Sequence, residues 1–318
     1  MSNAQHSKEE LFVSLVGLFK GKGDSGFSYN STAEQVTDGI DLGGKTVLLT
    51  GCNSGLGQET LRVLGLRGAH VIATARTEEK ATSALAASGT TGTPVACELS
   101  EPKSVHDCIA RVESLGRRID AIICCAGIMA LPKLRKIHGF EAQFFTNHIG
   151  HFILVTGLLD TLADDGRVVM VSSRAHHRVP KEGIELDNLG GDRGYSAFRA
   201  YGQSKLANLL FAKHLATKLP GRKQTSNAIH PGVIDTNLTR HMIAFARVGM
   251  KVTGSIFLKS IPQGAATQCY VATHPDVATK SGEYFLDCNV GQSSRVSNDA
   301  QLAARLWAKS EEIVASLD

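Results

Sequence analysis

The stretch TGCNSGLG, residues 50–57, decides the fold that this sequence predicts. It follows a short apolar run, KTVLLTG (45–51), and leads into QETLRVLGLRGAH (58–70), where apolar residues recur at helical spacing. Glycines at 51, 55 and 57 permit a tight turn and a close approach of backbone to a phosphate. A helix starting here presents free N–H groups and its positive dipole end to that phosphate. The stretch therefore predicts a dinucleotide-binding turn between a first strand and a first helix.

Six further β-branched or apolar runs alternate with segments of helical periodicity along the chain. Runs that are apolar on both faces are typical of a parallel sheet covered by helices on both sides. We therefore predict a leader at 1–39 and one α/β domain over 40–318, a Rossmann-type, doubly wound parallel sheet in a three-layer αβα arrangement. The further strands are expected at 69–76, 93–99, 119–127, 166–173, 226–232 and 282–288.

The composition is that of an ordinary globular protein. Of the 318 residues, 42% are hydrophobic and 20% charged, and 34 Lys and Arg against 30 Asp and Glu give a net charge of +4. This small, evenly spread excess argues against a nucleic-acid partner. Neither a secretory signal nor a membrane-spanning run occurs, so we expect a soluble intracellular protein, cytoplasmic in location. The apolar residues at 11–19 predict a short helix packed on the domain, a frayed terminus or weak contact with a membrane surface.

The cysteines and histidines give no metal-binding pattern. Seven cysteines, an odd number, lack C-x-x-C or zinc-ligand spacing, which indicates a reducing compartment. Cys124 and Cys125 are neighbours in a predicted strand, so their side chains should point to opposite faces. We interpret them as structural residues rather than a redox pair or metal ligands. The histidines at 151, 176, 177 and 230 are interpreted as loop or structural residues, and no metal is expected.

The second predicted strand indicates which nicotinamide dinucleotide binds. In an NAD site a carboxylate at the end of this strand accepts a hydrogen bond from the ribose 2′-hydroxyl, whereas a 2′-phosphate needs a cation. Ala75 stands where the acid would be, and Arg76 follows it. Because a guanidinium binds phosphate with two hydrogen bonds, NADP(H) is favoured over NAD(H). The alternative, that Arg76 is a solvated surface residue, leaves the absent acid unexplained.

The segment AYGQSKLANLLF (200–211) carries the candidate chemistry. Tyr201 and Lys205 are four residues apart on a predicted helix, so their side chains share one face. An ammonium there is expected to stabilise the phenolate and lower the pKa of Tyr201 toward neutrality, which makes the tyrosine a general acid and base. A Tyr-x-x-x-Lys pair alone is often a coincidence. Ser173 just past a strand end and Asn147 on the preceding helix strengthen this interpretation.

Taken in order, these motifs resemble those of the short-chain dehydrogenase/reductase family over nearly all of residues 40–290. The family's T-G-x-x-x-G-x-G turn is matched by TGCNSGLG, its active-site serine and asparagine by Ser173 and Asn147, and its Tyr-x-x-x-Lys by Tyr201 and Lys205. The chain is most similar to the branch that contains retinol dehydrogenases, WW-domain oxidoreductases and plastid Tic-associated members. That similarity lies in TNHIGHF (146–152), SSRAHH (172–177), SKLAN (204–208), HPGVIDTNL (230–238) and the leader phrase STAEQVTDGIDLGGK (31–45).

The resemblance implies a role for each matched residue. Ser173 would hydrogen-bond the substrate oxygen, Tyr201 would give or take its proton, and Lys205 would perturb Tyr201 and hold the nicotinamide ribose. Asn147 would position the water that relays the proton to solvent. The other residues implied to bind the cofactor are Gly51, Asn53, Ser54, Gly55, Leu56, Gly57, Arg76, Glu98, Leu99, Cys125, Ala126, Gly127, Pro231, Gly232, Val233 and Thr236.

Two positions depart from the family's pattern. CCAG (124–127) replaces Asn-Asn-Ala-Gly, so Cys125 stands in for an asparagine that supports the central sheet. Cysteine is a weak hydrogen-bonding substitute, which puts sheet stability rather than activity in doubt. Glu98 stands where the family commonly has the aspartate that contacts the adenine amino group. The extra methylene shifts the carboxylate, while the Leu99 backbone can still make the contact.

The substrate is the least determined part of the prediction. The segment 238–262 is expected to form one wall of the cleft, and its apolar residues suit a lipophilic alcohol, aldehyde or ketone as well as they suit ordinary helix packing. We expect an NADP(H)-dependent enzyme acting on CH–OH donors, monomeric or homodimeric. Reduction of a carbon–carbon double bond and a redox-sensing or scaffold role stay open as alternatives. The apolar residues in question are Met242, Phe245, Met250, Ile256 and Phe257.

Overall fold

The computed structural model describes residues 21–219, 223–234 and 258–317. Its main sheet has eight strands in the order β10-β9-β8-β7-β4-β1-β2-β3, and all neighbouring strands are parallel except β9 and β10. The chain builds outward from β1 to β3, returns to the centre and builds outward again from β4, which confirms the doubly wound Rossmann-type fold. The strands are β1 (Thr46–Thr50), β2 (His70–Ala75), β3 (Gly92–Ala96), β4 (Ile119–Cys124), β7 (Leu162–Val171), β8 (Thr225–His230), β9 (Tyr284–Leu286) and β10 (Asn289–Val290).

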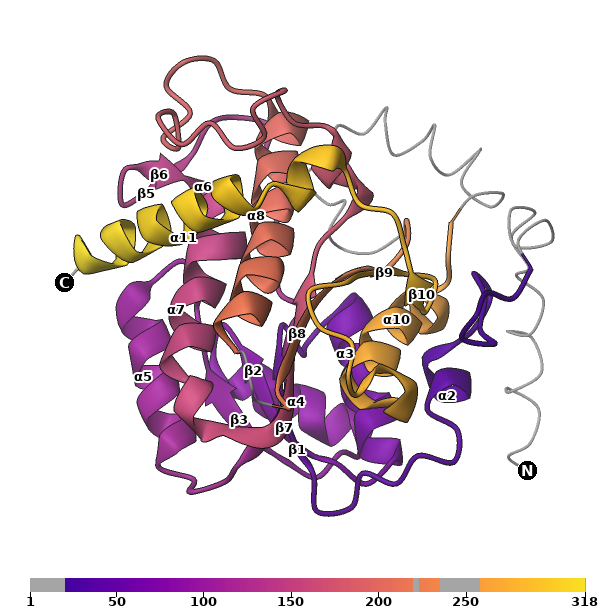
Figure 1. Cartoon of the computed structure of the whole chain (residues 1–318). Coiled ribbons are helices and arrows are strands. Elements are labelled where there is room, and N and C mark those ends of the chain that lie inside the picture. Colours follow the sequence, from indigo (N-terminus) through magenta and orange to yellow (C-terminus); the bar gives the residue numbers. More distant parts are fainter. Residues whose placement is uncertain (1–20, 220–222, 235–257, 318) are drawn as a thin grey trace.

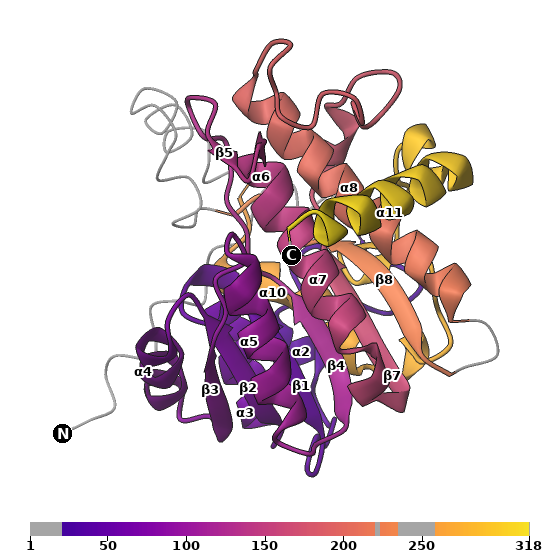
Figure 2. The ribbon, with the colours of Figure 1, turned by 90° about the vertical axis from the view of Figure 1, so that its left-hand side faces the viewer.

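Helices cover both faces of the sheet, as Figures 1 and 2 show. Successive residues of β1 belong to different cores: Leu48 packs with α5, α7, α8 and α11, whereas Val47 packs with α2, α3, α4 and α10. This is why the three central residues of the strand, Val47 to Leu49, are all apolar. The α-helices are α2 (Ala33–Val36), α3 (Gly55–Leu66), α4 (Glu78–Ser88), α5 (Pro102–Glu113), α6 (Ala142–Phe144), α7 (Gly150–Gly157), α8 (Ala197–Lys218), α10 (Ile261–Thr273) and α11 (Ala300–Ala315).

Short irregular elements join these helices and strands. A two-stranded hairpin lies between β4 and α6, and a π-helical turn joins α6 to α7. The hairpin is β5 (Lys136–Ile137) with β6 (Phe140–Glu141), the π turn is η1 (Phe145–Ile149), and the 3₁₀ turns are η2 (Leu159–Thr161), η3 (Arg174–His177), η5 (Pro275–Val277) and η6 (Arg295–Asn298).

Residues 21–39 of the predicted leader lie against α10 and β10. The Phe27 ring meets the edge of Tyr270 at a centroid distance of 5.5 Å. The Asn289 side chain accepts a hydrogen bond from the Ser25 N–H at 3.0 Å and donates to the Phe27 carbonyl at 3.3 Å. This part of the leader therefore packs on the domain, whereas the boundary at residue 40 stays a prediction. Residues 11–19 lie outside the described part of the chain.

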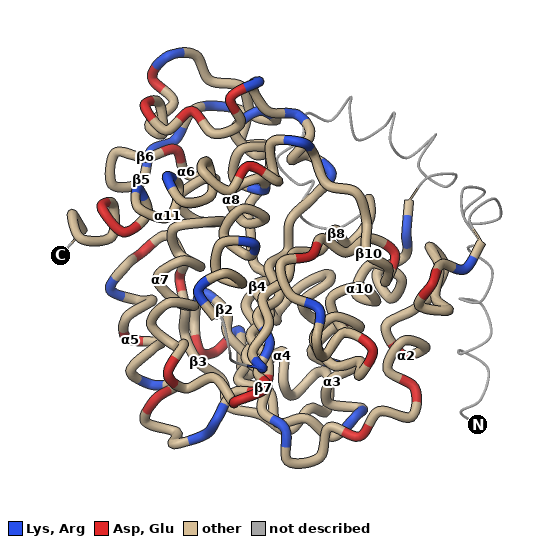
Figure 3. The backbone as a smooth tube through the Cα atoms, in the orientation of Figure 1, with Lys and Arg blue, Asp and Glu red and all other residues tan. Residues whose placement is uncertain are grey.

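In the part of the chain that the structure describes, the positions of Lys and Arg are interspersed with those of Asp and Glu along the backbone tube in Figure 3. This distribution agrees with the small net charge, and the absence of a nucleic-acid partner stays a prediction. Over the ranges that the structure describes, no helix is both long enough and apolar enough to cross a bilayer. The cytoplasmic location stays a prediction.

Candidate active site

A cleft of about 920 Å³ runs along the carboxyl ends of the parallel strands. Its lining comes from the segments that follow β1, β2, β3, β4, β7 and β8, together with α8. Ligands of doubly wound sheets bind at this edge. Every site residue predicted from the sequence lines the cleft except two. Asn147 is fully buried behind it, and Thr236 lies outside the described residues.

The glycine turn after β1 is shaped by close backbone contacts. Gly51 has a φ of 73°, and a Cβ on it would lie 2.9 Å from the Cα of Ala126. A Cβ on Gly57 would lie 2.1 Å from the Gly51 carbonyl oxygen. Ser54 is the N-cap of α3, but its side chain makes no capping hydrogen bond. The N–H groups of the first helical turn thus lack that partner, and the turn fits a bound phosphate group.

The residues after β2 and β3 form one end of the cleft. Ala75 is buried, and the exposed Arg76 follows it without an ion pair to any residue in the described ranges. One carboxylate oxygen of Glu98 accepts hydrogen bonds from the backbone N–H of Ser100 at 3.2 Å and from its hydroxyl at 2.8 Å. Leu99 is buried, and its carbonyl oxygen would lie 2.3 Å from a Cβ on Gly150. The cation at this end is therefore available to an anionic ligand.

Cys124 and Cys125 point to opposite faces of the sheet, as predicted. Cys124 is fully buried in the core on the α8 side, whereas the half-buried Cys125 packs against the core on the α10 side. The Cys125 Sγ accepts a hydrogen bond from Gln268 Nε2 at 3.5 Å. Both thiols are free. Burial raises the pKa of each thiol, so neither is a reactive thiolate at neutral pH.

Ser173, Tyr201 and Lys205 meet at the other end of the cleft. Ser173 follows β7, and its Oγ accepts a hydrogen bond from the Ala175 N–H at 3.2 Å. Tyr201 on α8 shares a side-chain hydrogen bond with Ser173. The Lys205 Nζ donates to the Val171 carbonyl at 2.9 Å and lies 5.7 Å from the centroid of the Tyr201 ring. A strand end and one helix face thus bring three polar side chains to one point.

Burial determines the pKa values of this group. Burial raises the pKa of Tyr201 to about 12, and the hydrogen bond with Ser173 opposes that effect. Burial also lowers the pKa of Lys205 to about 8. The lowered tyrosine pKa that the four-residue spacing predicts is therefore wrong for the protein chain itself. The physical reason is that burial removes water from the Tyr201 side chain, which disfavours the charged phenolate.

Asn147 lies in η1, where the Gly150 N–H bonds to the Phe145 carbonyl five residues back. Its Oδ1 accepts from the Ile128 N–H at 2.8 Å, and its Nδ2 donates to the Ile128 carbonyl at 2.9 Å and to Ser204 Oγ at 3.0 Å. The side chain thereby ties the loop after β4 to α8. Both amide hydrogens and the amide oxygen are used within the chain, and the role of Asn147 in positioning a water stays a prediction.

Thr50 and His151 are further polar residues that the sequence motifs did not identify as part of the site. His151 is fully buried; its Nδ1 donates to the Asn147 carbonyl at 2.9 Å, and its Nε2 accepts from Thr50 Oγ1 at 2.9 Å. Thr50 Oγ1 in turn accepts from the Ala126 N–H at 3.0 Å. Burial lowers the pKa of His151 to about 4, so the ring is neutral. The four-residue spacing from Asn147 to His151 is the only sequence signal for this link.

Two other histidines support the turn that carries Ser173. His176 Nδ1 donates to the Ser173 carbonyl at 2.6 Å, and its Nε2 accepts from the Ser294 N–H at 3.1 Å. His230 Nδ1 accepts from the Arg174 N–H at 3.3 Å. The interpretation of both as structural histidines is confirmed, because their ring nitrogens hold backbone groups of the chain.

The segment after β8 also lines the cleft. Gly232 has a φ of 98°, and a Cβ on it would lie 2.6 Å from Lys259 Cδ. The side chain of Val233 is 53% exposed toward the cleft. The apolar residues predicted to form a wall, Met242, Phe245, Met250, Ile256 and Phe257, lie outside the described residues.

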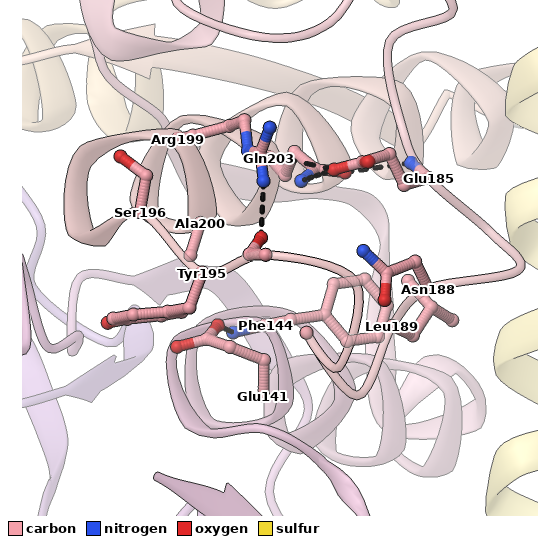
Figure 4. Close-up of a pocket in the computed structure, with 12 residues that line it drawn as sticks. Glu141, Phe144, Glu185, Asn188, Leu189, Tyr195, Ser196, Arg199, Ala200 and Gln203 are labelled. Carbon is pink, nitrogen blue, oxygen red and sulfur yellow. Dashed lines mark hydrogen bonds and ion pairs between the residues drawn. The ribbon is translucent and has the colours of Figure 1, made fainter. Parts of the chain in front are cut away.

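A second, much smaller cavity of about 30 Å³ lies beside the first turns of α8, between that helix, α6 and the loop at 185–196 (Figure 4). The side chain of Gln203 donates to Glu185 at 2.9 Å, and Arg199 lies 3.8 Å from the same carboxylate. A volume of about 30 Å³ is large enough for a water molecule but too small for an organic substrate. The large cleft is therefore the candidate active site.

Comparisons with known proteins agree with this geometry. A family model described as short chain dehydrogenase matches residues 45–245. Short-chain dehydrogenase TIC 32 B, chloroplastic, of Brassica napus is 43% identical over 323 residues, covering 96% of this chain and 100% of its own. Retinol dehydrogenase 12 of Mus musculus is 36% identical, with 87% and 89% covered. WW domain-containing oxidoreductase of Drosophila melanogaster is 34% identical, with 92% and 73% covered.

Solved structures share the fold. A crystal structure of an uncharacterised protein from Mycobacterium paratuberculosis superposes with a TM-score of 0.72 at 34% identity, covering 88% of this chain and 97% of its own. The angucycline C-6 ketoreductase LanV with bound NADP gives a TM-score of 0.61 at 25% identity, with 77% and 95% covered. The chain therefore belongs to the short-chain dehydrogenase/reductase family, in the branch that includes TIC 32, the retinol dehydrogenases and the WW domain-containing oxidoreductase.

Proposed function

We propose that this family member is an NADP(H)-dependent oxidoreductase that interconverts a lipophilic alcohol and its aldehyde or ketone, with Tyr201 as general acid and base. The observation that carries the proposal is the convergence of Ser173, Tyr201 and Lys205 in the cleft that begins at the glycine turn. The names of two similar proteins, a retinol dehydrogenase and a ketoreductase with bound NADP, support the reaction class.

The residues that line the cleft fit a nicotinamide dinucleotide. The uncapped N-terminus of α3 and the turn at Gly51 and Gly57 would hold the pyrophosphate, and Arg76 would hold a 2′-phosphate. Gly127 lies beside the other end, where a Cβ on it would come 3.1 Å from Asn147 Oδ1 and 3.5 Å from Lys205 Nζ. When bound, the nicotinamide donates or accepts the hydride.

The chain's own residues manage the proton. With a pKa of about 12, Tyr201 carries its proton at neutral pH and can donate it to a carbonyl oxygen during reduction. The Ser173 hydroxyl, already hydrogen-bonded to Tyr201, can share the same oxygen. Lys205 is charged below about pH 8 and stabilises the phenolate that proton donation leaves behind. In the oxidative direction Tyr201 accepts the alcohol proton instead.

Consumption of NADPH with a panel of lipophilic aldehydes, ketones and enones tests the proposal. Tyr201→Phe should lower turnover of the aldehydes and ketones by a factor on the order of 10² or more, while NADPH still binds, because only the acid/base group is lost. Tyr195→Phe is the matched control, since this tyrosine lies outside the cleft and donates to the Leu131 carbonyl at 2.6 Å. Turnover of the enones alone would favour a double-bond reductase. No turnover of any of the three classes would refute the proposal that the protein is an oxidoreductase.

A further inference from the structure

We propose that the substrate of this cleft is amphipathic and carries an anionic oxygen group, a carboxylate or a phosphate, away from its reacting carbon. The inference rests on the proposed function, because it names the substrate class of the same site. Its basis is a cluster of three arginines, Arg135, Arg174 and Arg178, which line the cleft together with Ser173 and Tyr201. We call these three residues the arginine cluster.

Two members of the cluster lie far from the groups that fit the cofactor phosphates. Arg174 and Arg178 follow β7, whereas Arg76 follows β2, three strands away in the order β7-β4-β1-β2. At roughly 4.8 Å per strand the separation is about 14 Å. The glycine turn after β1 is two strands away, about 10 Å on the same spacing. A dinucleotide seated on Arg76 and the glycine turn therefore leaves the cluster for another ligand.

The cluster has no carboxylate partner in the part of the chain that the structure describes. All three arginines are exposed, and no ion pair joins them to any described residue. Among the described residues that line the cleft, Glu98 is the one acid; it follows β3, four strands from β7, and binds Ser100. Cations nearby on the same surface do have partners. These pairs are Lys136 with Asp192 at 2.5 Å and Arg193 with Asp187 at 2.6 Å.

The backbone holds Arg174 and Arg178 beside the proposed catalytic residues. Arg174 is the first residue of the η3 turn and Arg178 is its C-cap, and this turn approaches α8 at Gly202, next to Tyr201. A Cβ on Gly202 would lie 2.7 Å from the Ala175 carbonyl oxygen and 2.8 Å from that of Arg178. Side-chain motion can therefore reorient the guanidinium groups, but their Cα atoms stay close to Tyr201.

Arg135 reaches the cleft from a different part of the chain. It immediately precedes β5, and its carbonyl accepts a hydrogen bond from the Ala142 N–H at 2.9 Å. Three positive side chains that line one cleft make its electrostatic potential more positive. They also raise the local concentration of anionic ligands. Guanidinium groups favour carboxylate and phosphate, because their donors match two oxygens at once.

Apolar side chains line the cleft near the cluster. Phe198 and Val233 are 42% and 53% exposed, unusually open for large apolar residues, and both line the cleft. Met129 and Ile137 add to this apolar surface. An apolar wall with arginines beside it suits a ligand that has a hydrocarbon body and one anionic group. A neutral lipophile would give the arginine cluster no carboxylate or phosphate, and no described residue supplies one.

Three substrates with one carbon chain test the inference: a medium-chain ω-oxo carboxylic acid, the matching ω-oxoalkyl phosphate, and the methyl ester of the acid. At saturating NADPH and low salt, kcat/KM for at least one anion should exceed that for the ester by about ten-fold. The preference should shrink at high ionic strength, because the arginines are exposed. The anion that is preferred identifies which oxygen group the substrate carries.

Single variants assign the preference to the cluster. Arg135→Gln and Arg178→Gln should each reduce the ratio of kcat/KM values between anion and ester by several-fold. Arg174 is left unchanged because it adjoins Ser173. Arg193→Gln is the matched control, an exposed arginine that is paired with Asp187 and does not line the cleft. Thermal melts check that each variant is folded.

The outcomes separate this inference from the proposed function. If kcat/KM for the ester equals that for both anions, and the variants leave these ratios unchanged, the proposal of an anionic substrate is overturned. The proposed oxidoreductase function would still hold. No turnover of any of the three by the NADPH-loaded protein refutes both. An unchanged ratio combined with loss of binding to anionic phosphatidylserine vesicles in Arg178→Gln would assign the cluster to a membrane surface and overturn the inference.

Discussion

Tyr201 and Lys205 show how burial acts on single ionisable groups. Water is removed from both side chains, and in each case the uncharged form gains: the pKa of Tyr201 rises to about 12, and that of Lys205 falls to about 8. At neutral pH the tyrosine is still protonated and the lysine is still mostly charged. A protonated phenol beside an ammonium is the state that reduction of a carbonyl needs, whereas oxidation first requires a phenolate.

Arg76 is the residue on which cofactor choice depends. Arg76→Ala should weaken NADPH binding by about ten-fold or more and affect NADH little, because only NADPH has the 2′-phosphate that the guanidinium can bind. Titration calorimetry with each cofactor measures this. Arg111→Ala, an exposed arginine on α5 outside the cleft, is the control. Equal affinity of the unmodified protein for NADPH and NADH would contradict the proposed preference.

At the scale of elements, the sequence predicted what local patterns encode. The seven predicted strands are present, because each run is rich in β-branched or apolar residues, and the glycine turn lies where its spacing placed it. The β5–β6 hairpin was missed. It turns at His138 and Gly139, both at positive φ, and histidine is a much weaker signal for such a turn than asparagine. The two-residue strand β10 also lacks any alternation that could be recognised.

Other features of the site depend on tertiary contacts and have no local signal. The arginine cluster combines Arg135 with two residues about forty positions later, and only the folded chain brings them to one cleft. The π turn around Asn147 and the bond from His151 to its carbonyl likewise appear only when α6 and α7 pack against α8. The direction of the Tyr201 pKa shift follows from burial, which spacing along a helix does not report.

The contact between η3 and α8 sets the geometry of Ser173 and Tyr201. In Gly202→Ala the new Cβ would lie 2.7 Å from the Ala175 carbonyl oxygen, so η3 must move away and carry Ser173 with it. Because a shift of about 1 Å at a reacting group can cost on the order of 10²-fold in rate, we expect kcat to fall at least about ten-fold with NADPH binding retained.

Steady-state kinetics and cofactor titration on the same samples measure the effect of Gly202→Ala. Gly21→Ala is the control, because a Cβ at that position meets nothing within 4 Å. Unchanged kcat in a folded Gly202→Ala protein would show that the spacing between η3 and α8 does not control the reaction.

At the scale of the whole molecule, four buried histidines join separate parts of the fold. His148 on η1 bonds through Nε2 to Ser310 Oγ of α11 at 2.9 Å, and His151, His176 and His230 make the contacts around the cleft described above. Burial lowers the pKa to about 3 for His148 and His230 and to about 4 for His151 and His176. In the folded protein all four therefore stay neutral at pH values where the same histidines of an unfolded chain are already charged.

This difference predicts a fold that loses stability in mild acid. Between about pH 6.5 and pH 4 the unfolded chain binds protons at these histidines and the folded chain does not, so the free energy of unfolding falls as the pH drops. Each histidine contributes at most about 1.4 kcal/mol per pH unit. Glu141 acts in the opposite direction, because burial raises its pKa and the folded chain takes up that proton more readily. Four histidines should outweigh this one carboxylate.

Urea denaturation at a series of pH values from about 7 to about 5 measures the effect. The unmodified protein should lose stability steeply over this range. His148→Gln keeps a hydrogen-bonding side chain beside Ser310 but replaces a buried ring, so it should be less stable at neutral pH. Because it also removes one titrating group, its free energy of unfolding should depend on pH less steeply, by about one proton. His106→Gln, at an exposed position on α5, should run parallel to the unmodified protein. If His148→Gln leaves the slope of the unfolding free energy against pH unchanged, the acid sensitivity arises elsewhere. The reason is that the unfolded variant can no longer bind a proton at position 148.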